Sequence, residues 1–330
     1  MMTRDEVKSS HLFNAFKAFA EQSESATGSL LKTPQTPAEH LARLARYADV
    51  FKTFYEPGKH ARLATFLRRL EAIDTTTVYP FLLYAYAELV PKHTDEFDRI
   101  LELIESYLMR RMICAMTTKN YNRYFIDLMR ALDKKGAITA ANVVEYMAKS
   151  TADSTLFPDD SAFETATFGM PLYNRLAQYK VRSILEALDA YSPDAKSEPL
   201  PLPPGLTIEH VMPQSWQTHW ALSDEDKVDP VTEQQAVARR NRLVNTLGNL
   251  TLITGSLNPS LSNSNWGTKR PELLKFSKLN LTQYFHGSDA EYWNEEAIEK
   301  RTRHLYLQMG KIWPALPVVV PSDNSLIANS

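Results

Sequence analysis

The sequence predicts a mainly α-helical protein, in which a helical domain is followed by a short β-hairpin, a helix and a closing C-terminal helix. Apolar residues recur at helical spacing through most of residues 1–191, as on the buried face of amphipathic helices. Glycine is scarce, with 10 residues in 330, which is typical of helices joined by few strained turns. Two later apolar runs, at 206–211 and 250–253, have the length of strands.

We expect residues 1–191 to form a helical bundle domain. Thr94 or Asp95 can cap a helix over residues 97–113, on which Arg110 and Arg111 stand among apolar residues. We interpret this arginine pair as buried and structural, and a phosphate-facing pair is the alternative. The other expected helices cover residues 12–19, 41–51, 63–70, 81–89, 121–132, 139–147 and 172–188.

A proline-rich segment is expected to end this domain. Residues 192–205 include five prolines, which cannot continue a helix and favour an extended linker. A second domain should follow over residues 206–285, with a strand, a polar loop and helix to Arg242, a second strand, and a helix near Lys269. Residues 286–316 should then form a C-terminal helix that packs back on the body, and residues 317–330 a flexible tail.

The composition is that of an ordinary globular protein and sets few limits on function. The formal charge is -2, so any contact with nucleic acid must come from local patches of positive charge. Cys114 is the single cysteine, which excludes both an intramolecular disulfide and a cysteine-ligated zinc. No apolar stretch has the length of a signal peptide or a membrane span, so we expect a cytoplasmic protein.

The most informative pair of residues is Glu209-His210, in the run Ile-Glu-His-Val-Met-Pro-Gln. Successive side chains of a strand point to opposite faces, so the carboxylate and the imidazole should address different sides of one phosphate. A histidine can deprotonate a water, while a carboxylate and an amide oxygen can hold a hard divalent cation. The pair therefore predicts a metal-dependent nuclease, although a lone Glu-His pair is more often an inconsequential surface dipeptide.

Two asparagines follow some forty to fifty positions later and support this interpretation. Asn249, beside Gly248, can hydrogen-bond the backbone of a facing loop, including the loop that carries the histidine. Asn258 precedes Pro259, and its amide oxygen is a suitable ligand for Mg²⁺. A turn residue and a capping residue are the respective alternatives.

Basic and aromatic residues lie further along the same segment. Lys269 is followed at helical spacing by Lys275 and Lys278, which would form either a stripe that meets phosphates or a solvated helix face. Trp266 is interpreted as a core anchor rather than a base-stacking residue. His219 could serve as a second base, but a structural or exposed position is the preferred interpretation.

At these residues the sequence resembles the C-terminal nuclease domain of GmrSD-type modification-dependent restriction enzymes, which belongs to the HNH (His-Me finger) nucleases. The resemblance rests on Ile-Glu-His-Val-Met-Pro-Gln, on Leu-Gly-Asn-Leu-Thr-Leu-Ile, and on the asparagines and lysine that follow. Two helical segments, residues 105–111 with 121–122 and residues 301–313, are also similar to the surroundings of the motif in that family.

This resemblance implies DNA cleavage by a ββα-metal (HNH) finger that holds one Mg²⁺ or Mn²⁺ ion. His210 matches the general base, Glu209 and Asn258 the metal ligands, Asn249 the middle asparagine, and Lys269 a lysine associated with the motif. The chain departs from many HNH enzymes by having glutamate where they have aspartate, and asparagine where the third histidine would stand. Full-length members carry an N-terminal nucleotide-hydrolysing sensor domain, which we expect as a partner in the same protein.

Two other functions remain open at this stage. The finger could be a degenerate module that binds DNA or a protein partner without cutting, on a helical scaffold. It could also act on RNA, because a site that addresses only the phosphodiester backbone does not by itself distinguish the sugars.

Overall fold

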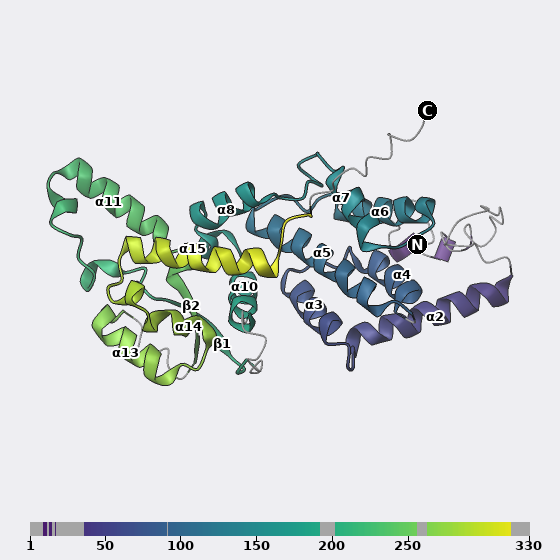
Figure 1. Ribbon diagram of the computed structural model, residues 1–330, viewed down its shortest axis with the longest axis horizontal. Helices are drawn as coiled ribbons and strands as arrows, with labels where there is room; N and C mark the ends of the chain where they lie inside the picture. Colours follow the sequence, from purple (N-terminus) through teal and green to yellow (C-terminus); the bar gives the residue numbers. More distant parts are fainter. Residues whose placement is uncertain are drawn as a thin grey trace, which may run out of the picture. The chain divides into compact units, whose positions relative to one another are not determined.

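A computed structural model describes residues 36–317, apart from 91, 192–201 and 256–262, together with residues 9–11, 13, 14 and 17. The described chain is mainly helical with one two-stranded sheet, as predicted (Figure 1). None of its described helices is both long enough and apolar enough to cross a membrane. Pro317 is the only described residue of the expected tail, and most of the expected linker also lies outside the description.

The chain divides into two compact units. One consists of Met1–Arg111, Met116–Phe157 and Ala315–Ser330, and the other of Met112–Ala115 and Pro158–Pro314. The division near residue 157 differs from the expected boundary in the proline-rich segment. The helix over 178–190 packs on both strands, and the helix over 160–169 packs on the C-terminal helix of the same unit.

The first unit is a set of packed helices that follow the expected periodicity closely. Thr36 opens the first of them through a capping box with Glu39, in which each side chain accepts a hydrogen bond from the other residue's backbone N–H. The helices are α2 (Pro37–Tyr55), α3 (Ala61–Ala72), α4 (Tyr79–Leu89), α5 (Thr94–Ile113), α6 (Tyr121–Lys135) and α7 (Ala140–Ala148).

Arg111, on α5, has the structural role that its position among apolar residues suggested. Its guanidinium is fully buried and donates to the main-chain carbonyls of Leu156 and Thr117, each at 2.6 Å. It also lies over the rings of Tyr107 and Tyr121, 5.4 and 5.5 Å from their centroids. A charge satisfied in this way holds the loops after α5 in place and does not face a phosphate.

The second unit carries the sheet and the helices around it. Its helices are α8 (Asp160–Gly169), α9 (Leu172–Arg175), α10 (Gln178–Ala190), α11 (Pro230–Leu243), α13 (Trp266–Phe276), α14 (Asn280–Gln283) and α15 (Glu295–Ile312). The prediction of a single helix over 172–188 is wrong, because Leu176 and Ala177, with ψ angles of 151° and 144°, are not helical and separate α9 from α10. The short α9 is held by a tertiary contact, in which Tyr173 donates its N–H to the carbonyl of Asn245 at 3.2 Å.

The two strands are those expected, within one residue at each end. β1 (Leu206–His210) pairs antiparallel with β2 (Leu250–Thr254), and the register sets Glu209 opposite Thr251 and His210 opposite Leu250. The loops and helices around the sheet enclose a core of large apolar and aromatic side chains. Its largest members are Trp216, Trp220, Trp266, Phe285 and Trp293. Trp266 is therefore the core anchor that the sequence predicted.

The helix α15 covers the turn that leads into β2. It packs against the 3-10 turn Leu247–Asn249 and also against α8, α10 and α11 (Figure 1). The turn comes so close that a Cβ atom on Gly248 would lie 2.2 Å from the carbonyl oxygen of Ile298 and 2.2 Å from Oγ1 of Thr302. Arg301 reinforces this contact, since its Nη1 donates to the carbonyls of Gly248 (2.8 Å) and Leu250 (2.6 Å).

This close approach predicts that Gly248→Ala destabilises the second unit. A methyl group there must displace helix backbone, and overpacking of this kind costs about 1–3 kcal/mol or more. Thermal unfolding should show a lower Tm for Gly248→Ala. Gly310→Ala is the control, because a Cβ at that position of α15 meets no atom within 4 Å and alanine favours the helix. Equal Tm values for the two variants would contradict the packing described.

Candidate active site

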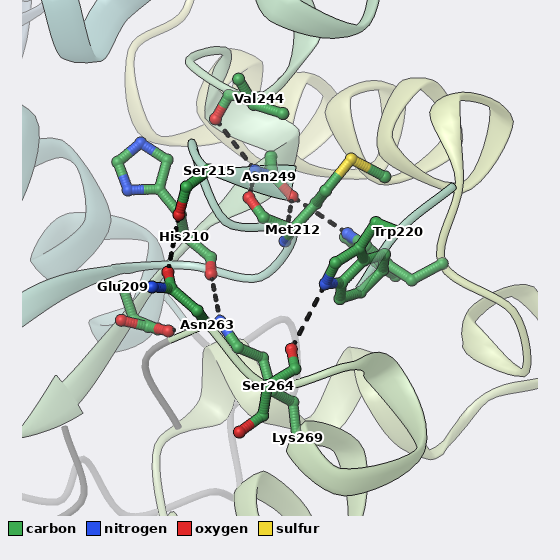
Figure 2. Close-up of polar contacts among 11 residues, drawn as sticks. Glu209, His210, Met212, Ser215, Trp220, Val244, Asn249, Asn263, Ser264 and Lys269 are labelled. Carbon is green, nitrogen blue, oxygen red and sulfur yellow. Dashed lines mark hydrogen bonds and ion pairs between the residues drawn. The ribbon is translucent and has the colours of Figure 1, made fainter. Parts of the chain in front are cut away.

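The end of β1 presents two titratable side chains on consecutive residues. Glu209 is buried, with 8% of its surface exposed, whereas His210 is only partly buried. Figure 2 shows the carboxylate and the imidazole leaving the strand in different directions, as the alternation of side chains along a strand requires. The two groups therefore lie close along the chain but face different surroundings.

Lys269 is the partner of the buried carboxylate. It stands in the first turn of α13, which begins after Asn265 caps its backbone, and its side chain is fully buried. Its Nζ lies 2.6 Å from Oε1 of Glu209 and donates to the main-chain carbonyl of His210 at 2.8 Å (Figure 2). Lys269 thus belongs to neither a solvated face nor a phosphate-facing stripe, and that interpretation of residues 269–278 is wrong for this lysine.

Burial changes the protonation behaviour of this pair. Loss of water around the carboxylate raises the pKa of Glu209, and the same loss around the ammonium lowers the pKa of Lys269. Attraction between the two charges, at hydrogen-bond distance, opposes both shifts. The pair is therefore held together in a place where either charge alone would be costly.

Asn249 fixes the loop that follows the histidine, as the sequence predicted. Its Oδ1 accepts from the N–H of Met212 (2.8 Å) and from Nε1 of Trp293 (3.0 Å). Its Nδ2 donates to the carbonyls of Met212 (2.8 Å) and Val244 (2.9 Å). The buried amide uses its full hydrogen-bonding capacity, and it ties the chain after β1 to the chain before β2 (Figure 2).

The ring of His210 lies between two residues that the sequence did not single out. The ring of Tyr173 packs against it edge to face, with centroids 4.4 Å apart. On another side, Nε2 of His210 is 3.3 Å from Oδ1 of Asn245. Burial is the main cause that lowers the pKa of His210, to about 4; the hydrogen bond with Asn245 opposes this shift, and the nearby charge of Lys269 adds to it. The imidazole is therefore neutral at neutral pH, as a base must be.

A signal for Asn245 was present in the sequence. The residue stands in the apolar run Leu-Val-Asn-Thr-Leu, and a polar side chain in a buried run must find hydrogen-bond partners. Nothing comparable marks Tyr173, whose position depends on the break between α9 and α10.

The structure does not place the other candidate residues against Glu209 or His210. Asn258 lies outside the described residues. His219 is exposed, and Asn263 accepts a hydrogen bond from Ser215 at 3.0 Å. Within the described ranges, no cluster of three or more His, Cys, Asp or Glu side chains could hold a metal ion. Glu209 is the carboxylate at this site, and its Oε2 makes no hydrogen bond to another described residue.

The ion pair makes a prediction about stability. Lys269→Met leaves the buried Glu209 without a partner and should lower the free energy of unfolding by about 3–5 kcal/mol. Adding Glu209→Gln should recover part of this loss, because the amide is uncharged. Urea unfolding of both single variants and the double variant measures the coupling, with Lys278→Met, at an exposed lysine just beyond α13, as the control. Strictly additive losses would contradict a direct ion pair.

Comparison with known proteins gives a family match over the part of the chain that carries this site. Residues 157–306 match the family described as GmrSD restriction endonucleases, C-terminal domain. The match starts where the two units divide, and it includes β1, β2, α13 and most of α15. Comparison with curated proteins gave no match. Residues 157–306 of this chain are therefore similar to the C-terminal domain of GmrSD restriction endonucleases.

Proposed function

We propose that this chain is a metal-dependent DNA endonuclease of the HNH type, and that β1, β2 and α13 form its ββα-metal finger. One observation carries the proposal. A neutral histidine and a buried carboxylate stand on consecutive residues at the end of β1, inside a segment that matches a restriction endonuclease family. Phosphodiester hydrolysis needs a base for water and a group that anchors a cation, and the two side chains supply both.

The donor set is compatible with a hard divalent cation. Lys269 donates a hydrogen bond to Oε1 of Glu209, while Oε2 has no hydrogen bond to a described residue. Mg²⁺ is commonly bound through one or two protein oxygens and keeps several waters, so a single carboxylate oxygen is sufficient on the side of β1. Glu209 would hold Mg²⁺ or Mn²⁺ together with Asn258, whose role rests on the sequence resemblance alone. The ion, when bound, would offset negative charge on the scissile phosphate and on the leaving oxygen.

In this proposal His210 activates the water, and Asn249 and Lys269 hold the reacting groups in position. His210 accepts a proton from water, whose oxygen forms a bond to phosphorus as the bond from phosphorus to the 3′ oxygen breaks. The leaving 3′ oxygen takes up a proton from solvent, and the products are a 5′-phosphate and a 3′-hydroxyl. Asn249 holds the loop beyond His210, and Lys269 holds both Glu209 and the His210 carbonyl. Both residues therefore reduce the motion of the groups that react.

The family resemblance also suggests partners. We propose DNA as the substrate, restriction of foreign DNA as the role, and a nucleotide-hydrolysing domain as the unit that directs the nuclease to its target. Recognition of a modified base or backbone would then belong to that domain, while the site at β1 supplies cleavage.

Plasmid cleavage tests the proposal. The purified chain should nick or linearise supercoiled DNA with Mg²⁺ or Mn²⁺ and not with EDTA. His210→Ala should slow cleavage by a factor on the order of 10² or more, as expected for loss of a general base. His219→Ala is the matched control, because this exposed histidine lies nearby in the sequence and is not part of the site.

Three outcomes would count against the proposal. Equal rates for His210→Ala and the wild type would exclude His210 as the base. Cleavage that persists in EDTA would exclude a requirement for a divalent metal ion. Folded wild-type protein that binds DNA but does not cut it, with or without a nucleotide-hydrolysing partner domain, would favour the non-cutting binding module.

A further inference from the structure

Asn245 joins the end of α11 to the end of β1. Its side chain is buried, with 7% of the residue exposed. Its Nδ2 donates to the main-chain carbonyl of Asn241 at 3.2 Å. Its Oδ1 lies 3.3 Å from Nε2 of His210 and accepts a hydrogen bond from Nε2 of Gln214 at 2.7 Å. One amide thus connects the last turn of α11 with the histidine and with the loop beyond it.

These contacts determine which way the amide faces. A main-chain carbonyl can only accept a hydrogen bond, so the carbonyl of Asn241 must face the NH₂ group of Asn245. The opposite orientation would place two acceptors against each other. The oxygen of Asn245 therefore faces His210, and an oxygen can bond to Nε2 only if that nitrogen carries the proton.

The backbone of Asn245 fixes a second neighbour of the ring. Its carbonyl accepts from the N–H of Tyr173 at 3.2 Å, and the ring of Tyr173 packs edge to face on the imidazole of His210. The imidazole is thus held by a hydrogen bond at its Nε2 and by an aromatic contact on its side. Rotation of the ring would break both contacts.

We propose that Asn245 is a positioning residue of this site, which keeps the proton of the neutral His210 ring on Nε2 and leaves Nδ1 as the nitrogen that takes the proton of the attacking water. The step with water rests on the proposed nuclease function, whereas the assignment of the ring proton rests on the hydrogen bonds alone. The arrangement follows a general pattern, in which a partner on one imidazole nitrogen decides which nitrogen is free to react.

Nitrogen NMR of the metal-free protein tests the ring proton directly. Protein labelled with ¹⁵N in its histidines reports protonation at Nδ1 and Nε2 separately, and His210→Gln identifies the signals of His210. At a pH at which the ring is neutral, the wild type should carry its proton on Nε2. A proton on Nδ1 in the wild type would overturn the proposal, and this measurement needs no variant of Asn245 that folds.

Two substitutions of Asn245 then test its role. Asn245→Leu has a similar size but no acceptor, so the ring should exchange between both neutral forms. Asn245→Asp keeps an oxygen facing His210 and should retain the proton on Nε2. If the ring proton of His210 stays on Nε2 in Asn245→Leu, and the signals of the other histidines show that the protein is folded, the proposal is overturned.

Cleavage provides a second readout. Asn245→Leu should reduce kcat by about ten- to hundredfold, the usual cost of removing a group that orients an active-site residue, without changing the metal concentration at half-maximal rate. Asn174→Leu, the same substitution at an exposed position of α9, is the control. An unreduced kcat for Asn245→Leu would overturn the positioning role.

If the wild type cuts no DNA, the nuclease function fails while the NMR result still decides the assignment of the ring proton. If the wild type cuts and the proton lies on Nδ1, this inference alone fails.

Discussion

Burial of the Glu209 carboxylate is the constraint on which the arrangement of the site depends. An unpaired carboxylate in this position would cost several kcal/mol, so a cation must reach it from inside the protein. Lys269 does so from α13, which must therefore lie against the end of β1. Because the same ammonium also donates to the carbonyl of His210, a single charge fixes the carboxylate and the backbone of the neighbouring histidine together.

A second set of contacts relates the body of the domain to this site. Asn249 hydrogen-bonds the backbone of the loop after β1 and the backbone of the segment before β2, and its position follows from the turn in which it stands. That turn is pressed against α15 at Gly248, where there is no room for a side chain, and Arg301 holds its carbonyls. The C-terminal helix thus fixes the position of the turn, and the turn fixes the position of Asn249. Asn249 in turn holds the loop after His210 in place. This succession explains why a helix far along the sequence belongs to the same compact unit as the site.

The elements of the site were predictable from the sequence because each has a strong local pattern. The strands at 206 and 250 appear within one residue of their expected bounds, and a helix contains Lys269 as expected. The closing helix, Glu295–Ile312, is shorter than the expected segment 286–316 and lies inside it. The expected bonding of Asn249 to the facing loop was also correct. The burial of Lys269 was not predictable, since helical spacing alone made it one of a row of solvated lysines. The contacts of Asn245 and Tyr173 with His210 depend on how α9, α11 and β1 meet, and no local pattern contains that information.

The central claim is that this site hydrolyses DNA with water activated by His210. Analysis of the cleaved ends of a synthetic duplex, after reaction in water enriched in ¹⁸O, tests it most directly. The account predicts 3′-hydroxyl ends and 5′-phosphate ends that carry the label, because the oxygen of water forms the new bond to phosphorus. Ends that carry a 3′-phosphate, or 5′-phosphates without the label, would contradict it.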